Sequence, residues 1–144
     1  MKKNNQRIEA LVQEFNNLAN WEERYKRLIE IGKDLSPMDP SLQIEENKIK
    51  GCQSQVWLAV KLNSDKTLHF DANSDAMIVK GLVALLLIVY QDTSPKDILA
   101  ISTQFIKELG FESYLSPSRA NGLQAMIRQI QYYATAYQYL VSQT

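Results

Sequence analysis

One stretch of the sequence, NKIKGCQSQVWLAV (residues 47–60), contains the side chain best suited to covalent chemistry. This side chain is Cys52, the only cysteine of the chain, which follows Gly51 and precedes Gln53 and Ser54. Because glycine adopts backbone angles that other residues avoid, this short segment between two candidate strands predicts a turn. Side chains on turns are exposed more often than core side chains, so the pattern favours an accessible thiol.

The surroundings of Cys52 leave two interpretations open. Free cysteine is among the most buried residue types, which favours an inert core thiol. If extended geometry persists from Lys48 to Cys52, however, Lys48, Lys50 and Cys52 share one face of a strand. Positive charge near a thiol favours the nucleophilic thiolate, although two lysines are equally typical of a solvated strand edge.

The rest of the chain offers few partners for a catalytic cysteine. Acyl transfer needs a base beside the cysteine, and the only histidine, His69, lies on a candidate strand opposite the Leu68 and Phe70 face. One cysteine excludes an intrachain disulfide, a CxxC redox pair and a thiolate zinc site. Sulfur exchange needs only the thiolate, which attacks one sulfur of a partner's S–S bond and displaces the other. The residues therefore permit a cysteine that exchanges sulfur with a docked protein.

The composition is that of a globular protein without a strong charge. The chain has 144 residues, 45% of them hydrophobic, which fits a single domain over residues 1–144. Sixteen basic and sixteen acidic residues balance, so no basic field attracts nucleic acid. The apolar run at residues 81–90 is shorter than the roughly 20 residues that span a membrane, and residues 1–15 lack a signal sequence's apolar core. We therefore expect a cytoplasmic protein with a reduced thiol.

The hydrophobic periodicity predicts an α/β protein of the α+β kind, in which helices cover one face of a small antiparallel sheet. Asn20 with Glu23 predicts a capping box, and Ser94 with Pro95 predicts another helix start. The expected helices span residues 5–19, 21–32, 74–91 (capped by Asn73 or Ser74), a short segment after Ser94, 102–109 and 122–141. The expected strands span residues 44–49, 55–63 and 67–72.

Several segments resemble one known family. GCQSQVW, residues 51–57, resembles the cysteine motif of the SufE-type sulfur acceptor proteins. Other segments resemble the family in the same order and cover residues 20–130 together with the motif: NWEERY at 20–25, NSDAMIVKGL at 73–82, TSPKDI at 93–98 and LSPSRANGLQAMI at 115–127. The glutamines beside the cysteine resemble the SufE branch more than the CsdE branch.

The resemblance implies a fold similar to the U-type iron–sulfur scaffold proteins and a role in sulfur transfer. Cys52 would take sulfane sulfur from a SufS-type cysteine desulfurase as a persulfide, stimulate that enzyme, and pass the sulfur to an iron–sulfur scaffold complex. The pyridoxal phosphate would belong to the desulfurase, and this chain would carry no cofactor or metal. Family members commonly form dimers, so a homodimer is an expectation beside a monomer.

The resemblance also implies roles for residues near Cys52. Gly51, Gln53 and Ser54 would shape a loop that shelters the sulfur at rest and swings out on docking. Arg119 would contact the loop, the persulfide or the partner, or else brace the turn before the last helix. Asp75 would contact the loop or the partner, or else act only as a charge at a helix start.

The residues also leave three rival functions open. A regulator that binds the desulfurase without carrying sulfur would keep full stimulation after Cys52→Ser. A cluster scaffold normally needs several cysteine ligands, and a thiol hydrolase needs a base that the sequence does not offer. A sulfur acceptor is an accessory to the desulfurase, so whether this chain is itself an enzyme stays open.

Overall fold

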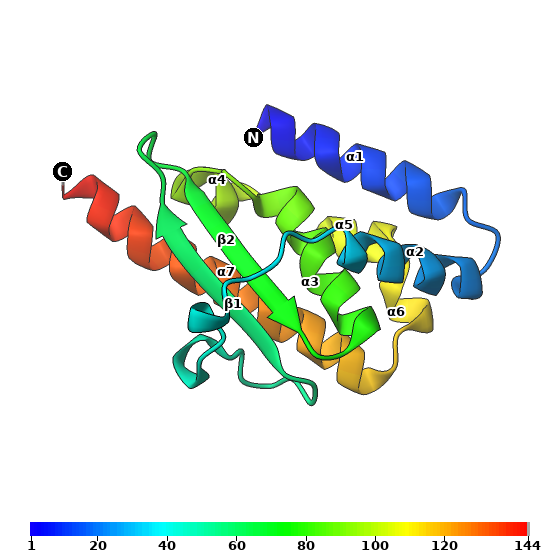
Figure 1. The fold of residues 1–144 in the computed structure, drawn as a ribbon. Helices are drawn as coiled ribbons and strands as arrows, with labels where there is room; N and C mark the ends of the chain where they lie inside the picture. Colours follow the sequence, from blue (N-terminus) through cyan, green and yellow to red (C-terminus); the bar gives the residue numbers. More distant parts are fainter. Residues whose placement is uncertain (144) are drawn as a thin grey trace.

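The computed structural model describes residues 1–143 and confirms the α+β class (Figure 1). The described residues form seven α-helices, two short 3₁₀ turns and one antiparallel pair of strands. The helices are α1 (Lys2–Asn16), α2 (Trp21–Lys33), α3 (Met77–Tyr90), α4 (Pro95–Ala100), α5 (Gln104–Glu108), α6 (Phe111–Tyr114) and α7 (Pro117–Ser142). The strands are β1 (Val56–Leu62) and β2 (Leu68–Ser74), and the turns are η1 (Pro40–Leu42) and η2 (Glu45–Asn47).

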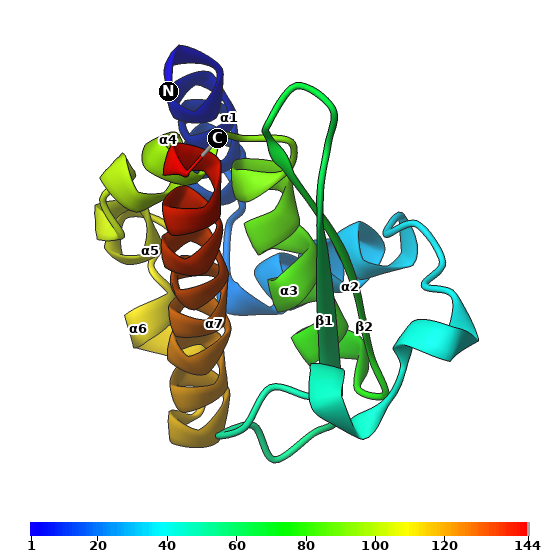
Figure 2. The ribbon, with the colours of Figure 1, turned by 90° about the vertical axis from the view of Figure 1, so that its left-hand side faces the viewer.

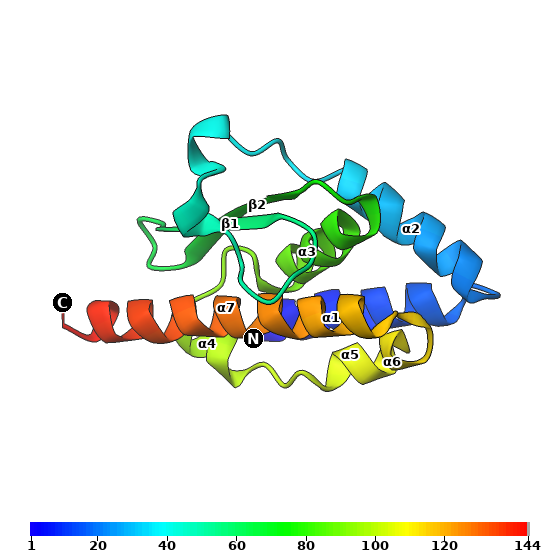
Figure 3. The ribbon, with the colours of Figure 1, turned by 90° about the horizontal axis from the view of Figure 1, so that it is seen from below.

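Helix α3 is the centre of the hydrophobic core. It is apolar on nearly every side, and ten of its fourteen residues are buried. Figure 2 shows α3 between α7 and the sheet, and Figure 3 shows α2 beside its other end. A helix that is hydrophobic all round is stable in water only when other elements cover it, as α2, α7 and the sheet do here. No helix in residues 1–143 is long and apolar enough to cross a membrane.

Two glycines let α2 and α3 cross at very short range. A Cβ atom built on Gly81 would lie 2.2 Å from the carbonyl oxygen of Leu28 in α2. A Cβ atom built on Gly32 would lie 2.9 Å from the backbone nitrogen of Gly81. No side chain fits at such distances, so the two helices pack backbone against backbone.

The sheet buries the face that the alternation predicted. Pairing runs from Val56 opposite Ser74 to Leu62 opposite Leu68. Leu58, Leu68 and Phe70 are almost fully buried, while the residues between them are only partly covered. The sheet therefore packs one face on the helices, as expected from its period of two.

Only two of the three expected strands form, and the prediction of a strand at residues 44–49 was wrong. This segment contains η2, in which Asn47 Nδ2 donates to the carbonyl oxygen of Leu42 at 2.8 Å. Glutamate and asparagine have low strand propensity, and asparagine side chains compete with the ladder by bonding nearby backbone. A single bridge between Lys48 and Trp57 remains of the expected pairing.

The free edge of β2 is covered by the segment after α3. The side-chain amide of Gln91 accepts from Phe70 N at 2.7 Å and donates to Phe70 O at 2.8 Å. The backbone N–H of Leu68 donates to the carbonyl oxygen of Thr93 at 2.9 Å. These bonds satisfy edge groups that would otherwise be free to pair with another chain.

The structure confirms some predicted helix ends and corrects others. Asn20 accepts from Glu23 N at 2.9 Å and Ser94 accepts from Asp97 N at 3.2 Å, as their sequence signals indicated. Helix α3 is not capped by Asn73 or Ser74, because both belong to β2, and it begins at Met77.

The last helix begins earlier than predicted. It starts at Pro117 and not at Gly122, because Ser116 accepts from Arg119 N and proline fits the first helical position. Helix α6 was not predicted, since it has only four residues; it follows Gly110, whose positive φ of 77° ends the preceding turn. Arg119 and Gly122 therefore both lie within the first turns of α7.

Candidate functional site

Cys52 lies on a short closed loop before β1. The backbone N–H of Ile49 donates to Val56 O at 2.8 Å, which closes residues 50–55 into a loop. Gly51 adopts a φ of 95°, a conformation that favours glycine, so the predicted turn is present. A Cβ atom built on Gly51 would lie 3.4 Å from the Cβ of Ala125, and Figure 3 shows the loop passing close to α7.

The Cys52 thiol is directed toward α7. Its Sγ lies 3.7 Å from the carbonyl oxygen of Gly122, to which the S–H donates. A Cβ atom built on Gly122 would lie 3.5 Å from Sγ, so a bare helix surface faces the sulfur. The side chain is half-buried and packs against the core. Burial raises the pKa of the Cys52 thiol, so this pose favours the neutral thiol.

A cavity of about 690 Å³ opens beside Cys52. Three residues that the sequence had singled out, Gln53, Ser54 and Arg119, line it together with the cysteine. The remaining lining is partly apolar and comes from α2, the start of α3 and the start of α7: Ile29, Ala76, Met77, Ile78, Val79, Ser116, Ser118, Gly122 and Met126. The sulfur therefore borders a space large enough for additional atoms, with apolar and polar walls.

Arg119 lies in the first turn of α7 and lines the cavity. Its guanidinium carbon is 5.7 Å from the centroid of the Tyr25 ring, which is a cation–π distance. This contact links α7 to α2, so Arg119 braces the start of the last helix while its side chain borders the space near Cys52. The two alternatives in the sequence analysis are thus compatible in the structure.

Asp75 holds the end of the cysteine loop and does not line the cavity. Its carboxylate accepts from the backbone N–H of Gln55 at 3.0 Å and from Gln55 Nε2 at 3.2 Å. The backbone N–H of Asp75 donates back to Gln55 O at 3.3 Å. The first turn of α3 contains no acidic residue, and Asp75 contacts the loop instead of acting as a helix-start charge.

The lysines do not share a face with the thiol, and that prediction was wrong. The turn at Gly51 breaks the extended geometry on which it depended. Lys48 pairs with Glu45 at 2.9 Å and lies over the Trp57 ring at 5.9 Å. Lys50 lines a different groove, described below. The described structure therefore shows no lysine stabilising a Cys52 thiolate, in agreement with the raised pKa of the thiol.

His69 lies outside the lining of this cavity. Its Nδ1 is 2.9 Å from Asp92 Oδ1 and its Nε2 is 3.9 Å from Asp71 Oδ1. No histidine base therefore accompanies Cys52. Among residues 1–143, no cluster of three or more histidine, cysteine, aspartate or glutamate side chains is arranged to hold a metal ion.

Sequence reasoning missed Gly122, which receives the thiol, and the two methionines Met77 and Met126 in the cavity wall. A signal for Gly122 was present but was hidden by the misplaced helix start. Glycine within a helix is unfavourable relative to alanine, so an internal glycine often indicates close approach of another group. For the methionines no sequence signal distinguishes a cavity wall from the core.

The fold and the site together define a class of protein: a small α+β protein that presents one half-buried thiol on a closed loop beside a cavity. The family model described as "SufE: Fe-S metabolism associated domain" matches residues 9–134. The chain therefore belongs to the SufE family, whose domain is associated with iron–sulfur metabolism. The match does not distinguish the branches within the family.

A solved structure shares the fold. It is the solution structure of a hypothetical protein from Thermus thermophilus, with a TM-score of 0.76 and 21% sequence identity. The match covers 92% of this chain and 96% of the other. The fold that positions Cys52 is thus shared with a second protein of low sequence identity.

Proposed function

We propose that this protein is a sulfur acceptor that receives sulfane sulfur on Cys52 from a SufS-type cysteine desulfurase and delivers it for iron–sulfur cluster assembly. One observation carries the proposal: the only thiol of the chain lies on a closed loop, with its Sγ against the Gly122 carbonyl of α7 and beside a cavity of about 690 Å³. Membership of a family associated with iron–sulfur metabolism supports the same direction.

The proposed step is a thiol–persulfide exchange. The Cys52 thiolate attacks the outer sulfur of a cysteine persulfide on the desulfurase, and a new S–S bond forms to Cys52. The S–S bond of the donor breaks, and the donor cysteine leaves as a thiolate. One sulfur atom moves, no net oxidation occurs, and the proton released when Cys52 ionises is available to the departing thiolate. No base, metal or cofactor of this chain is required.

The resting pose suits protection of the sulfur more than attack. Partial burial raises the pKa of the Cys52 thiol and favours its neutral form, which is a poor nucleophile. We infer that docking of the desulfurase moves residues 50–55 outward, where water and the partner's groups allow ionisation. Few hydrogen bonds hold the loop besides the one that closes it: Gln55 N and Nε2 donate to the Asp75 carboxylate, Asp75 N donates to Gln55 O, and the Cys52 S–H donates weakly to Gly122 O.

The cavity residues suit a persulfide that returns to the shelter. Met77 and Met126 offer polarizable apolar contacts, and Arg119 and Ser54 offer donors for a sulfur anion. Removing the product persulfide from the desulfurase would stimulate that enzyme. The sulfur would then pass to a scaffold complex downstream, while the pyridoxal phosphate stays on the desulfurase.

The reaction requires a reduced thiol, which agrees with a cytoplasmic setting. Whether two copies of the chain pair as a homodimer stays a prediction that size-exclusion chromatography with light scattering would test.

The test is stimulation of a cysteine desulfurase by the wild type and by Cys52→Ser. The acceptor function predicts that the serine variant binds the enzyme but loses stimulation. Full stimulation by Cys52→Ser would overturn the acceptor function and support the alternative, a regulator that binds the desulfurase without carrying sulfur.

A further inference from the structure

A second hollow lies on the other side of the cysteine loop. This groove, which we call the basic groove, has a volume of about 460 Å³. One wall comes from the segment before Cys52 and the other from the middle of α7. Its lining residues are Glu46, Lys48, Lys50, Ala125, Arg128, Gln129 and Tyr132. None of them lines the cavity beside Cys52.

The basic groove carries uncompensated positive charge. Its lining has three cations and one carboxylate, whereas the whole chain has no net charge. Lys48 is already paired with Glu45. Lys50 and Arg128 are exposed, and within residues 1–143 neither forms an ion pair or a side-chain hydrogen bond. Two cations on opposite walls are thus free to bind carboxylates from outside.

Tyr132 adds an aromatic surface to the rim. Its side chain is 67% exposed, one turn along α7 from Arg128. Exposed tyrosine and arginine side chains are enriched among the residues that dominate protein–protein binding energy. A groove with free cations and an exposed aromatic ring fits an acidic protein segment better than an apolar helix or a membrane surface.

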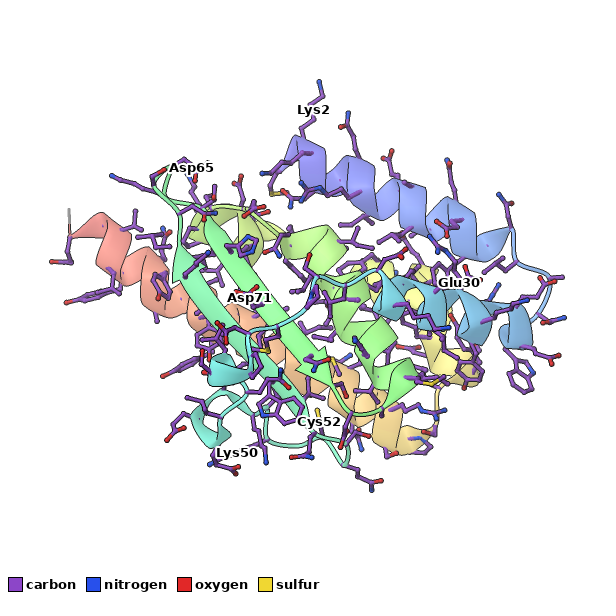
Figure 4. All side chains as sticks on the ribbon, in the orientation of Figure 1. Lys2, Glu30, Lys50, Cys52, Asp65 and Asp71 are labelled. Atoms are coloured by element: carbon purple, nitrogen blue, oxygen red, sulfur yellow. The ribbon has the colours of Figure 1, made fainter. Side chains whose placement is uncertain are left out.

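The basic groove is physically continuous with the cysteine loop. Figure 4 shows Lys50 and Cys52 on the same loop before β1, with Lys50 at its outer side. Gly51 lies close to Ala125, which belongs to the groove lining, since a Cβ atom built on Gly51 would lie 3.4 Å from the Ala125 Cβ. A group that binds Lys50 therefore acts on the backbone two residues from the sulfur.

We propose that the basic groove docks an acidic segment of the cysteine desulfurase, whose carboxylates pair with Lys50 and Arg128. This inference rests on the proposed function, because it assigns the docking surface for the same sulfur transfer. Binding at Lys50 and Arg128 brings the donor against the loop that carries Cys52.

The experiment measures desulfurase affinity by isothermal titration calorimetry at 50 mM and 500 mM salt. The variant Lys50→Glu/Arg128→Glu reverses both free cations, and like charges across an interface are strongly unfavourable. We expect at least a roughly tenfold loss of affinity at low salt, and a weaker dependence on salt than in the wild type, because exposed charge pairs are screened. Lys50→Gln/Arg128→Gln, which removes charge without repulsion, should lose less.

Lys96→Glu/Lys107→Glu is the matched control. Both lysines are exposed, and they lie on α4 and α5, which Figure 3 shows on the opposite side of α7 from the sheet. This variant changes the net charge equally and should bind as the wild type does. An equal loss in the control would show a general charge effect and overturn the proposal. Binding of a single-stranded oligonucleotide that the groove variant abolishes, with desulfurase affinity intact, would also overturn it.

Persulfidation of the wild type separates this inference from the proposed function. If the wild type gains sulfur on Cys52 and the groove variant binds with unchanged affinity, the groove proposal fails and the acceptor function stands. If the wild type gains no sulfur but the groove variant loses salt-dependent binding, the groove proposal stands and the acceptor function fails. A wild type that does not bind the desulfurase would overturn the groove proposal outright.

Discussion

The hydrogen bonds that the Asp75 carboxylate accepts predict how tightly the cysteine loop is held. Asp75→Ala removes both bonds to Gln55, one at 3.0 Å and one at 3.2 Å, and leaves the core untouched. Both bonds are exposed, so each stabilises the closed loop by about 0.5–1 kcal/mol, near the lower end of measured values. Loss of the pair shifts the balance between closed and open loop by about 1–2 kcal/mol, which corresponds to a roughly 5–30-fold larger open population.

The assay is the rate of Cys52 alkylation by iodoacetamide at pH 7.5. The closed loop and the raised pKa of the thiol both protect Cys52 from alkylation. We therefore expect the alkylation rate of Asp75→Ala to rise with the open population, by roughly 5–30-fold. Asp75→Asn keeps one acceptor oxygen for the Gln55 backbone and should give a smaller rise.

Asp65→Ala is the control for a general effect on the sheet. Asp65 also holds a turn, by accepting from Thr67 N at 3.1 Å and Thr67 Oγ1 at 2.6 Å, but at the opposite end of the hairpin. It should leave the alkylation rate of Cys52 unchanged. An unchanged rate in Asp75→Ala, in a protein with wild-type circular dichroism, would refute the idea that Asp75 latches the loop.

Three further predictions concern packing and ionisation. Gly81→Ala places a Cβ atom 2.2 Å from the carbonyl oxygen of Leu28. It should lower the free energy of unfolding, measured by urea denaturation, by about 3 kcal/mol or more. A loss below about 1 kcal/mol would contradict the close crossing of α2 and α3. Tyr90→Phe should raise the free energy of unfolding by about 1 kcal/mol, because the Tyr90 hydroxyl is buried and has no hydrogen-bond partner in the described residues. The same burial raises the pKa of Tyr90 to about 12. A lower free energy of unfolding in the variant would reveal a partner for the hydroxyl. Partial burial raises the pKa of the Cys52 thiol, so the thiol ionises in the unfolded chain first, above about pH 8.5. The free energy of unfolding of the wild type should therefore fall relative to that of Cys52→Ala between about pH 7 and pH 9.5. Equal pH dependence of the two proteins would contradict a raised thiol pKa in the folded state.

Periodic patterns predicted the fold where many residues carried the same signal. The apolar run in α3 indicated a buried helix, and the alternation around Leu58 and Phe70 indicated which face of the sheet is buried. The third strand failed for a local reason: glutamate and asparagine have low strand propensity, and the Asn47 side chain bonds the Leu42 backbone, so only the bridge from Lys48 to Trp57 of β1 forms. The contacts of Gln91 and Thr93 with β2 were not predictable, because contacts between segments far apart in the sequence leave no periodic trace.

The site was predictable as far as its loop and no further. Gly51 and Cys52 together indicated a thiol on a turn, and the left-handed φ of Gly51 agrees with that. The contact of the thiol with α7 was not predictable, because the carbonyl oxygen that accepts from the Cys52 S–H belongs to Gly122, seventy residues further along the chain. The lysine prediction failed for a local reason, since the same turn that presents the cysteine breaks the strand geometry that would have aligned Lys48 with it.

The most direct test of the sulfur acceptor function is intact-protein mass spectrometry without reductant. Wild type and Cys52→Ser are incubated with a cysteine desulfurase and cysteine, and the mass of each protein is measured. The account predicts one added sulfur on the wild type and none on the variant. An unmodified wild type, under conditions in which the desulfurase itself carries a persulfide, would contradict it.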